Sequence, residues 1–267
     1  MSEIREGENM ALYKTVLVTG ASAGFGFAIC EKLAWQGYKV IAAARRQEKL
    51  DALANKYKGQ IFPLKLDVTD TDAVDSIIDK LPDEFKNIDV LVNNAGLALG
   101  QDQAFTCSLK DWHTMVDTNI KGLLNITHKL LPLMVKKNKG YIINLGSTAG
   151  AWPYTGGNVY GGTKAFVEQF SRNLRCDLAG TALKVTVIKP GLCSNTEFSN
   201  VRFKGDNKKA AAVYKDVEAI LPEDIADTVD YLLSTPAHMN INELEIMPVC
   251  QTFGGLAVTR NLDLGEK

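Results

Sequence analysis

The stretch VLVTGASAGFGFAI, residues 16–29, joins an aliphatic and β-branched run to an amphipathic run through three closely spaced glycines. Gly20, Gly24 and Gly26 leave the backbone between an expected strand and helix without Cβ atoms, so N–H groups at the helix start can approach a pyrophosphate. The alternative is a tight strand-to-helix turn without a ligand. Such a turn does not require three glycines at this spacing, so the pattern favours a nucleotide site.

Short apolar runs alternate with amphipathic segments of helical length along the chain. This alternation is typical of a parallel sheet, and the scarcity of polar residues in the runs indicates helices on both faces. The sequence therefore predicts the α/β class, with a single doubly wound parallel-sheet Rossmann domain. Strands are expected within residues 14–20, 39–45, 60–68, 88–96, 140–147, 183–191 and 242–249, and a helix at 222–233.

The domain is expected to span residues 14–267, after a polar N-terminal extension at residues 1–13 that we expect to be flexible. The alternation breaks at about residues 192–220, where the chain becomes irregular and charged. Ligands of doubly wound sheets bind beyond the carboxyl ends of the strands. We therefore expect this insertion to form the substrate loop.

Composition narrows the class of partner. Thirty basic and 31 acidic residues give a formal net charge of −1, so no long-range field attracts nucleic acid or an anionic membrane. We expect a small-molecule substrate instead. Five scattered cysteines without a CxxC pair argue against disulfides and zinc, and indicate a reducing, cytoplasmic compartment with no bound metal. The polar N-terminus and short apolar runs lead us to expect neither secretion nor membrane insertion.

The second expected strand ends at Ala44 and is followed by Arg45 and Arg46. Folds that bind NAD usually place an acidic residue here, which accepts a hydrogen bond from the ribose 2′-hydroxyl. A carboxylate would repel the 2′-phosphate of NADP, whereas guanidinium groups offer it several donors. The alternative is a pair of solvated arginines at a helix start. Their position at the carboxyl end of the strand favours NADP as the cofactor.

Tyr160 and Lys164 lie four positions apart in NVYGGTKAFVEQF, residues 158–170, where a helical pattern begins. Chance alone produces many such pairs on one face of a helix. A phenol has a pKa near 10, so it works as a general acid or base near neutrality only after a drop of about two to three units. A nearby ammonium favours phenolate and lowers that pKa, and Lys164 is placed to do so.

Several short motifs occur in a fixed order. They are TGASAGFG at 19–26, LDV at 66–68, NNAG at 93–96, Asn119 within a helix, GSTAG at 146–150, YGGTK at 160–164 and PG at 190–191. Together they resemble the classical short-chain dehydrogenase/reductase family from about residue 14 onward. Longer strings, such as residues 146–166 and 190–206, resemble its NADP-dependent 3-hydroxy acid dehydrogenases, the group of serine and L-allo-threonine dehydrogenases and malonic semialdehyde reductases.

The resemblance implies an oxidoreductase that transfers a hydride between NADP and a 3-hydroxy acid of the L-allo-threonine, L-serine or 3-hydroxypropionate type. It also implies a homotetramer. One alternative is a general NADPH-dependent carbonyl reductase of aldehydes and ketones, and another is a non-catalytic NADP-sensing protein. The set of Ser147, Tyr160 and Lys164 favours an enzyme, because a sensor has no use for it.

By resemblance, four residues would carry the chemistry. Tyr160 would be the general acid or base, and Lys164 would lower its pKa and bind the nicotinamide ribose. Ser147 would bond to the substrate oxygen, so that Ser147 and Tyr160 both contact substrate. Asn119 would hold a water that links Lys164 to solvent; the alternative is an Asn that satisfies an irregular helix.

By resemblance, the cofactor would contact the glycine turn, the end of the second strand and the turns after later strands. The residues are Gly20, Ser22, Ala23, Gly24, Phe25, Gly26, Arg45, Arg46, Asp67, Val68, Asn94, Ala95, Gly96, Tyr160, Lys164, Pro190, Gly191, Leu192, Thr196, Glu197 and Phe198. Ala23 departs from many NADP-preferring relatives, which carry a basic residue at this position. We expect the hydroxyl of Ser22 to supply a donor instead.

A 3-hydroxy acid brings a carboxylate that must leave water, so its pocket needs a cation or several donors. Within the expected substrate loop, Arg202 has a fork geometry suited to a carboxylate, and Lys204 is a less directional second candidate. The alternative is that both are solvated. We place Arg202 in the substrate site.

Two further stretches bear on the shape of the pocket. Trp152 and Tyr154 either line the pocket or pack on the core. Cys193, Ser194 and Asn195 depart from the small and aliphatic residues of the 3-hydroxy acid dehydrogenases, so we expect the loop to differ there from this group.

Overall fold

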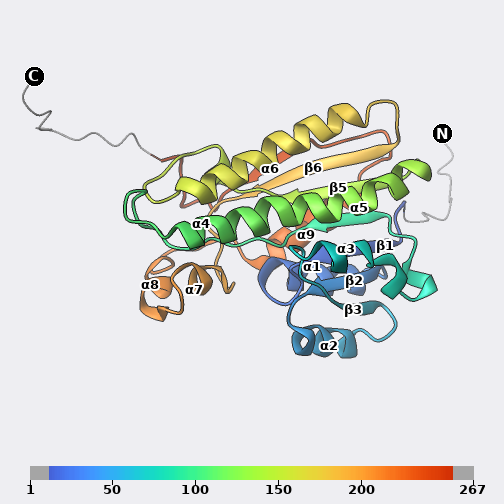
Figure 1. Cartoon of the computed structure of the whole chain (residues 1–267), viewed down its shortest axis with the longest axis horizontal. Helices are drawn as coiled ribbons and strands as arrows, with labels where there is room; N and C mark the ends of the chain where they lie inside the picture. The colour runs from blue at the N-terminus through green and yellow to red at the C-terminus, as the bar shows by residue number, and fades with distance from the viewer. Residues whose placement is uncertain (1–11, 255–267) are drawn as a thin grey trace, which may run out of the picture.

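The computed structural model describes residues 12–254, which form a seven-stranded sheet in the order β3-β2-β1-β4-β5-β6-β7 (Figure 1). Every pairing of neighbouring strands is parallel. This order, which reverses direction beside β1, is that of the doubly wound dinucleotide-binding fold, and the predicted fold class is confirmed. The strands are β1 (Thr15–Thr19), β2 (Lys39–Ala44), β3 (Ile61–Lys65), β4 (Val90–Asn93), β5 (Gly140–Leu145), β6 (Leu183–Pro190) and β7 (Glu243–Ile246).

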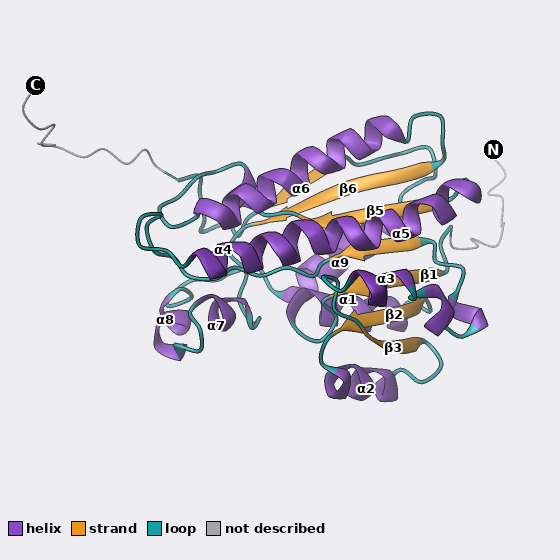
Figure 2. Cartoon of the chain, in the orientation of Figure 1, coloured by secondary structure: helices purple, strands orange, loops and turns teal. Residues whose placement is uncertain are grey.

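Helices cover both faces of the sheet, with α5 and α6 on one face and α1 and α9 on the other (Figure 2). The helices are α1 (Gly24–Trp35), α2 (Gln47–Lys56), α3 (Thr71–Asp75), α4 (Leu109–Val116), α5 (Leu123–Lys136), α6 (Asn158–Asp177), α7 (Phe198–Arg202), α8 (Asn207–Ala212) and α9 (Pro222–Ser234). Short helical turns lie at η1 (Ile78–Lys80), η2 (Asp83–Phe85), η3 (Asp117–Gly122) and η4 (Thr148–Gly150). None of the helices in residues 12–254 has the length and hydropathy of a membrane-spanning segment.

β1 shows why the strands read as continuous apolar runs. Val16 and Val18 point to the face covered by α1 and share a core cluster with Ile29. Leu17, between them, points to the opposite face and shares a second cluster with Ile126 of α5. Both faces of the strand are buried, so alternation with polar residues is lost.

The N-terminal boundary of the domain lies before residue 14. Tyr13, which the sequence assigned to the extension, is 2% exposed, and its ring centroid lies 5.8 Å from that of Tyr141. The domain therefore includes Tyr13. Residues 1–11 of the expected extension and residues 255–267 of the expected domain lie outside the described residues.

The insertion after β6 is closed at its base by backbone hydrogen bonds. Ser194 N donates to Ile220 O at 2.9 Å, and Ile220 N donates to Leu192 O at 3.1 Å. Between these points the chain forms α7 and α8, which lie together beyond the carboxyl ends of the strands (Figure 1). The expected irregular loop therefore contains two short helices and stands beside the end of the sheet where ligands bind.

Candidate active site

A cavity of about 920 Å³ lies at the carboxyl ends of the strands. The glycine turn after β1, the arginines after β2, the NNAG turn after β4, the turn after β5 and the insertion after β6 all line it. All the site residues expected from the sequence line this cavity except Gly26 and Asn119. Segments far apart in the chain thus form one site.

The glycine turn presents the N-terminus of α1 to the cavity. Gly20 and Gly24 have φ values of 68° and 54°, which a residue with a Cβ rarely adopts. Among the described residues, no side chain caps the N-terminus of α1 at Ala23, and the first turn of the helix holds no acidic residue. Its N–H groups and helix dipole are therefore available to an anion.

Gly26 lies behind the turn instead of lining the cavity. A Cβ at this position would overlap the carbonyl oxygen of Gly20 and the side-chain nitrogen of Asn94. Asn94 in turn donates to the Thr19 carbonyl oxygen at 2.9 Å, and this contact ties β4 to β1. Gly26 therefore serves the close packing of the helix on the strand, one of the roles of a glycine in this motif.

Arg46 extends from the end of β2 into the cavity, and Arg45 is exposed beside it. Arg46 Nε and Nη2 donate to Ser22 Oγ at 3.1 and 2.9 Å, and Arg46 Nη2 lies 2.8 Å from Glu197 Oε2. The Arg46 and Glu197 side chains are 40% and 50% exposed, and exposed pairs stabilise by only about 0–1 kcal/mol. A doubly charged phosphate can therefore replace Glu197 at this guanidinium.

Asn119 lies in the π-helical turn η3 and is 2% exposed. Its Oδ1 accepts from Leu97 N at 2.8 Å, and its Nδ2 donates to Leu97 O at 2.8 Å and to Thr163 Oγ1 at 3.0 Å. The side chain thus ties the turn after β4 to α6, next to Lys164. This geometry favours the structural alternative for the Asn119 side chain, and the water relay stays a prediction.

Tyr160 and Lys164 lie on one face of α6, 8% and 7% exposed, opposite the turn that carries Ser147. Lys164 Nζ donates to Leu145 O at 2.7 Å and lies 5.9 Å from the centroid of the Tyr160 ring. Ser147 Oγ accepts from Ala149 N at 3.1 Å, and Ser147 lines the cavity together with Tyr160. The three groups expected to carry the chemistry therefore meet at one wall of the cavity.

Burial raises the pKa of Tyr160 to about 12, against smaller lowering effects of the neighbouring Ser147 hydroxyl and the charge of Arg202. The sequence led us to expect a lowered pKa through Lys164. The pKa of Tyr160 is raised and not lowered because its phenol is removed from water, while the Lys164 ammonium donates to the Leu145 carbonyl oxygen. Burial also lowers the pKa of Lys164 to about 8. At neutral pH Tyr160 is protonated, the state required of a proton donor.

Arg202, at the end of α7, reaches across the cavity to the wall that carries Ser147, Tyr160 and Lys164. Its Nε donates to Gly100 O at 3.1 Å, and its Nη2 donates to the Tyr154 hydroxyl at 2.6 Å. Its Cζ lies 5.8 Å from the centroid of the Tyr160 ring. The second candidate, Lys204, instead pairs with Asp111 at 2.7 Å and does not line the cavity among the described residues.

The model of the short chain dehydrogenase family matches residues 14–207. This chain belongs to that family. The NADP-dependent 3-hydroxy acid dehydrogenase YdfG of Escherichia coli strain K12 is 56% identical to it over 245 residues, which cover 92% of this chain and 99% of that protein. The serine 3-dehydrogenase of Agrobacterium fabrum is 52% identical over 246 residues, covering 92% and 98%. The solved closed form of a serine dehydrogenase complexed with NADP+ superposes with a TM-score of 0.91 at 55% identity, covering 92% of this chain and 100% of that one.

One wall of the short-chain dehydrogenase cavity was missed by sequence reasoning. Residues 247–254, after the last strand, return to the cavity and contribute Met247 and Gln251 to its lining. Gln251 Oε1 accepts from Leu192 N at 2.7 Å, and the Phe253 ring centroid lies 4.4 Å from that of Trp152. No motif marked this segment in the sequence; the only signal was that the chain continues past its last expected strand.

Proposed function

We propose that this short-chain dehydrogenase is an NADP-dependent oxidoreductase that interconverts a 3-hydroxy acid and its 3-oxo acid or semialdehyde. The expected substrates are of the L-serine, L-allo-threonine or 3-hydroxypropionate type. The observation that carries the preference for an acid is the position of the Arg202 guanidinium, which lies in the cavity 5.8 Å from the Tyr160 ring. The 3-hydroxy acid dehydrogenase and the serine 3-dehydrogenase that share more than half of the aligned residues support the same substrate class.

The cavity fits NADP in its charge and in its backbone geometry. The uncapped N-terminus of α1 suits the pyrophosphate, and Arg45 and Arg46 suit the 2′-phosphate. Asn94, Ala95 and Gly96 would lie along the middle of the cofactor. When bound, NADP supplies or accepts the hydride, and the residues of the chain bind substrate and handle the proton.

In the direction of reduction, Ser147 donates a hydrogen bond to the carbonyl oxygen of the substrate and fixes its position. Tyr160, protonated at neutral pH, passes its proton to the same oxygen as the alkoxide forms. The Lys164 ammonium stabilises the phenolate that remains. In the direction of oxidation the same groups act in reverse, and Tyr160 must first lose its proton.

Arg202 is the residue we propose to bind the substrate carboxylate. Two of its N–H groups are used by Gly100 and Tyr154, so others remain for a carboxylate. Arg202→Ala is expected to lower kcat/KM for 3-hydroxy acids by roughly 10- to 100-fold, the value of one charge-assisted contact. For uncharged alcohols and aldehydes of similar size, a change below about threefold is expected. Steady-state kinetics with both substrate types provides the measurement.

Lys204→Ala is the matched control, because it removes a loop cation that pairs with Asp111 outside the cavity lining. We expect Lys204→Ala to leave kcat/KM unchanged for both 3-hydroxy acids and uncharged substrates. If Arg202→Ala weakens charged and uncharged substrates equally, the carboxylate role is wrong and the general carbonyl reductase becomes the better description.

The proposed assembly and compartment rest on the family resemblance and the composition. We propose a homotetramer in the cytoplasm. Exposed apolar side chains, such as Leu109 of α4 and Leu133 of α5, offer surface for contacts between copies. No step of the proposed reaction depends on either property.

A further inference from the structure

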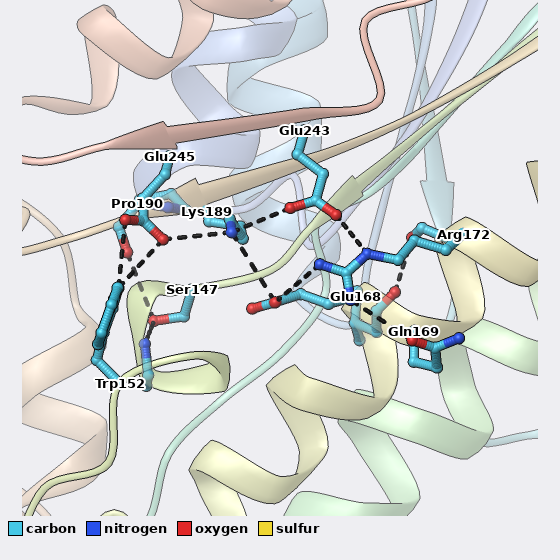
Figure 3. A network of polar contacts seen from close by, with 12 residues as sticks. Ser147, Trp152, Glu168, Gln169, Arg172, Lys189, Pro190, Glu243 and Glu245 are labelled. Carbon is cyan, nitrogen blue, oxygen red and sulfur yellow. Dashed lines mark hydrogen bonds and ion pairs between the residues drawn. The ribbon is translucent and has the colours of Figure 1, made fainter.

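A cluster of charged residues lies behind the catalytic wall, outside the cavity lining (Figure 3). Lys189 of β6 is at its centre, with its Nζ 3.1 Å from Glu243 Oε2, 3.2 Å from Glu245 Oε2 and 4.0 Å from Glu168 Oε2. Arg172 of α6 pairs with Glu243 at the outer rim. We refer to Glu168, Lys189, Glu243 and Glu245 as the back cluster.

The back cluster touches the turn that carries Ser147 at three points. A Cβ on Gly146 would lie 3.3 Å from Lys189 Cγ, and a Cβ on Gly150 would overlap Glu168 Oε1. The third point is the indole of Trp152, whose Nε1 donates to Glu245 Oε1 at 3.2 Å. The segment from residue 146 to 152 is thus in contact with three members of the cluster. Lys189 and Glu168 can lie this close to the turn because Gly146 and Gly150 have no Cβ atom.

Glu168 is the member that joins this turn to the catalytic helix. It lies on α6 one helical turn after Lys164 and two after Tyr160, with its side chain 6% exposed. Its Oε1, which faces Gly150, has no hydrogen-bond partner among the described residues. Burial raises the pKa of Glu168, against the lowering effect of Lys189 and Arg172. A poorly partnered buried carboxylate destabilises a fold, so its contact with the turn needs another explanation.

Within the described residues, the hydrogen bonds of the Ser147 side chain run to segments that the back cluster holds. Its Oγ accepts from Ala149 N at 3.1 Å and donates to Pro190 O at 3.5 Å. Ala149 precedes Gly150, against which Glu168 packs, and Pro190 follows Lys189. A shift of Ala149 or Pro190 would therefore displace the Ser147 hydroxyl relative to Tyr160.

We infer that the back cluster positions the Ser147 turn against α6, with Glu168 as the positioning residue that sets the distance between the Ser147 and Tyr160 hydroxyls. This inference rests on the role of Ser147 in the proposed function. It assigns to Glu168 an effect on the rate of the reaction without contact with substrate or cofactor. Small displacements of a positioned group cost large factors in rate, on the order of 10²-fold for 1 Å.

Glu168→Ala removes the oxygen that packs against Gly150 and is expected to lower kcat by roughly tenfold. The loss should be equal for hydroxy acids and uncharged substrates, with KM for NADP unchanged. Glu168→Gln keeps the shape of the side chain and is expected to restore kcat to within about threefold of the unchanged enzyme. Asp177→Ala is the matched control, since it removes an exposed carboxylate from the same helix that pairs with no member of the back cluster among the described residues.

The deciding experiment introduces Glu168→Ala into a Ser147→Ala background. If Glu168 acts through Ser147, it has no further effect on kcat there. A further tenfold loss of kcat when Glu168→Ala is added to Ser147→Ala would overturn the inference. A lowered Tm with unchanged kcat in Glu168→Ala alone would overturn it as well. Should Glu168→Ala not fold, Glu245→Ala, which removes the acceptor of the Trp152 indole N–H, takes its place in the same cycle. Failure of the proposed function is separate, because it would appear as a Ser147→Ala variant with undiminished turnover.

Discussion

Tyr160→Phe is expected to lower kcat by about 10²- to 10⁴-fold, the usual contribution of a general acid or base. The substitution removes one hydroxyl and keeps the ring, which lies 5.7 Å from the Phe198 ring, centroid to centroid. Binding of NADP, measured by fluorescence titration, should therefore change little. The loss should occur in both directions of the reaction, since the same oxygen gives and takes the proton.

The pH dependence provides a second readout of the same variant. Because burial raises the pKa of Tyr160 to about 12, the phenol holds its proton at neutral pH. Oxidation requires that proton to leave first, so the oxidation rate of the unchanged enzyme should increase with pH. This increase should disappear in Tyr160→Phe. Tyr231→Phe, which removes an exposed hydroxyl from α9, is the control. Turnover of Tyr160→Phe near that of the control would remove Tyr160 from the proton transfer.

The double variant Arg45→Ala/Arg46→Ala is expected to raise KM for NADP by roughly 10²-fold or more, the effect of losing two charge-assisted contacts with a phosphate. KM for NAD, which has no 2′-phosphate, should change by less than about threefold. Arg46 should account for the larger share, because Ser22 and Glu197 hold its guanidinium at the cavity. Initial rates with each cofactor at saturating substrate provide the measurement.

Lys49→Ala is the control for this variant, since it removes an exposed cation of α2 that does not line the cavity among the described residues. We expect Lys49→Ala to leave both cofactors unaffected. An equal increase in KM for NADP and for NAD in the double variant would show that the two arginines support the fold of the turn and do not select the cofactor.

The sequence predicted the fold, and it predicted which residues come together at the centre of the candidate site, because both signals are local. Apolar runs mark the strands, and the glycines between residues 20 and 26 mark the turn that begins α1. The pair Tyr160 and Lys164 shares a helix, so spacing alone places both on one face. The family resemblance added Ser147, which follows β5, and in the structure it lines the same cavity as Tyr160 and Lys164.

Other features depend on tertiary contacts that no local pattern encodes. Arg202 reaches Gly100 across 102 positions of sequence, and the back cluster joins α6, β6 and β7. The raised pKa of Tyr160 follows from its burial, which is a property of the packed site and not of the pair with Lys164. The return of residues 247–254 to the cavity has no sequence motif.

The most direct test of the proposed function measures formation of reduced nicotinamide at its absorption band with L-serine and L-allo-threonine. Each substrate is combined with NADP and with NAD, and an uncharged alcohol of similar size is measured beside them. We predict the highest kcat/KM for a 3-hydroxy acid with NADP, at least about tenfold above the same acid with NAD and above the uncharged alcohol. Turnover of the uncharged alcohol as efficient as that of every 3-hydroxy acid tried, or equal use of the two cofactors, would contradict the proposal.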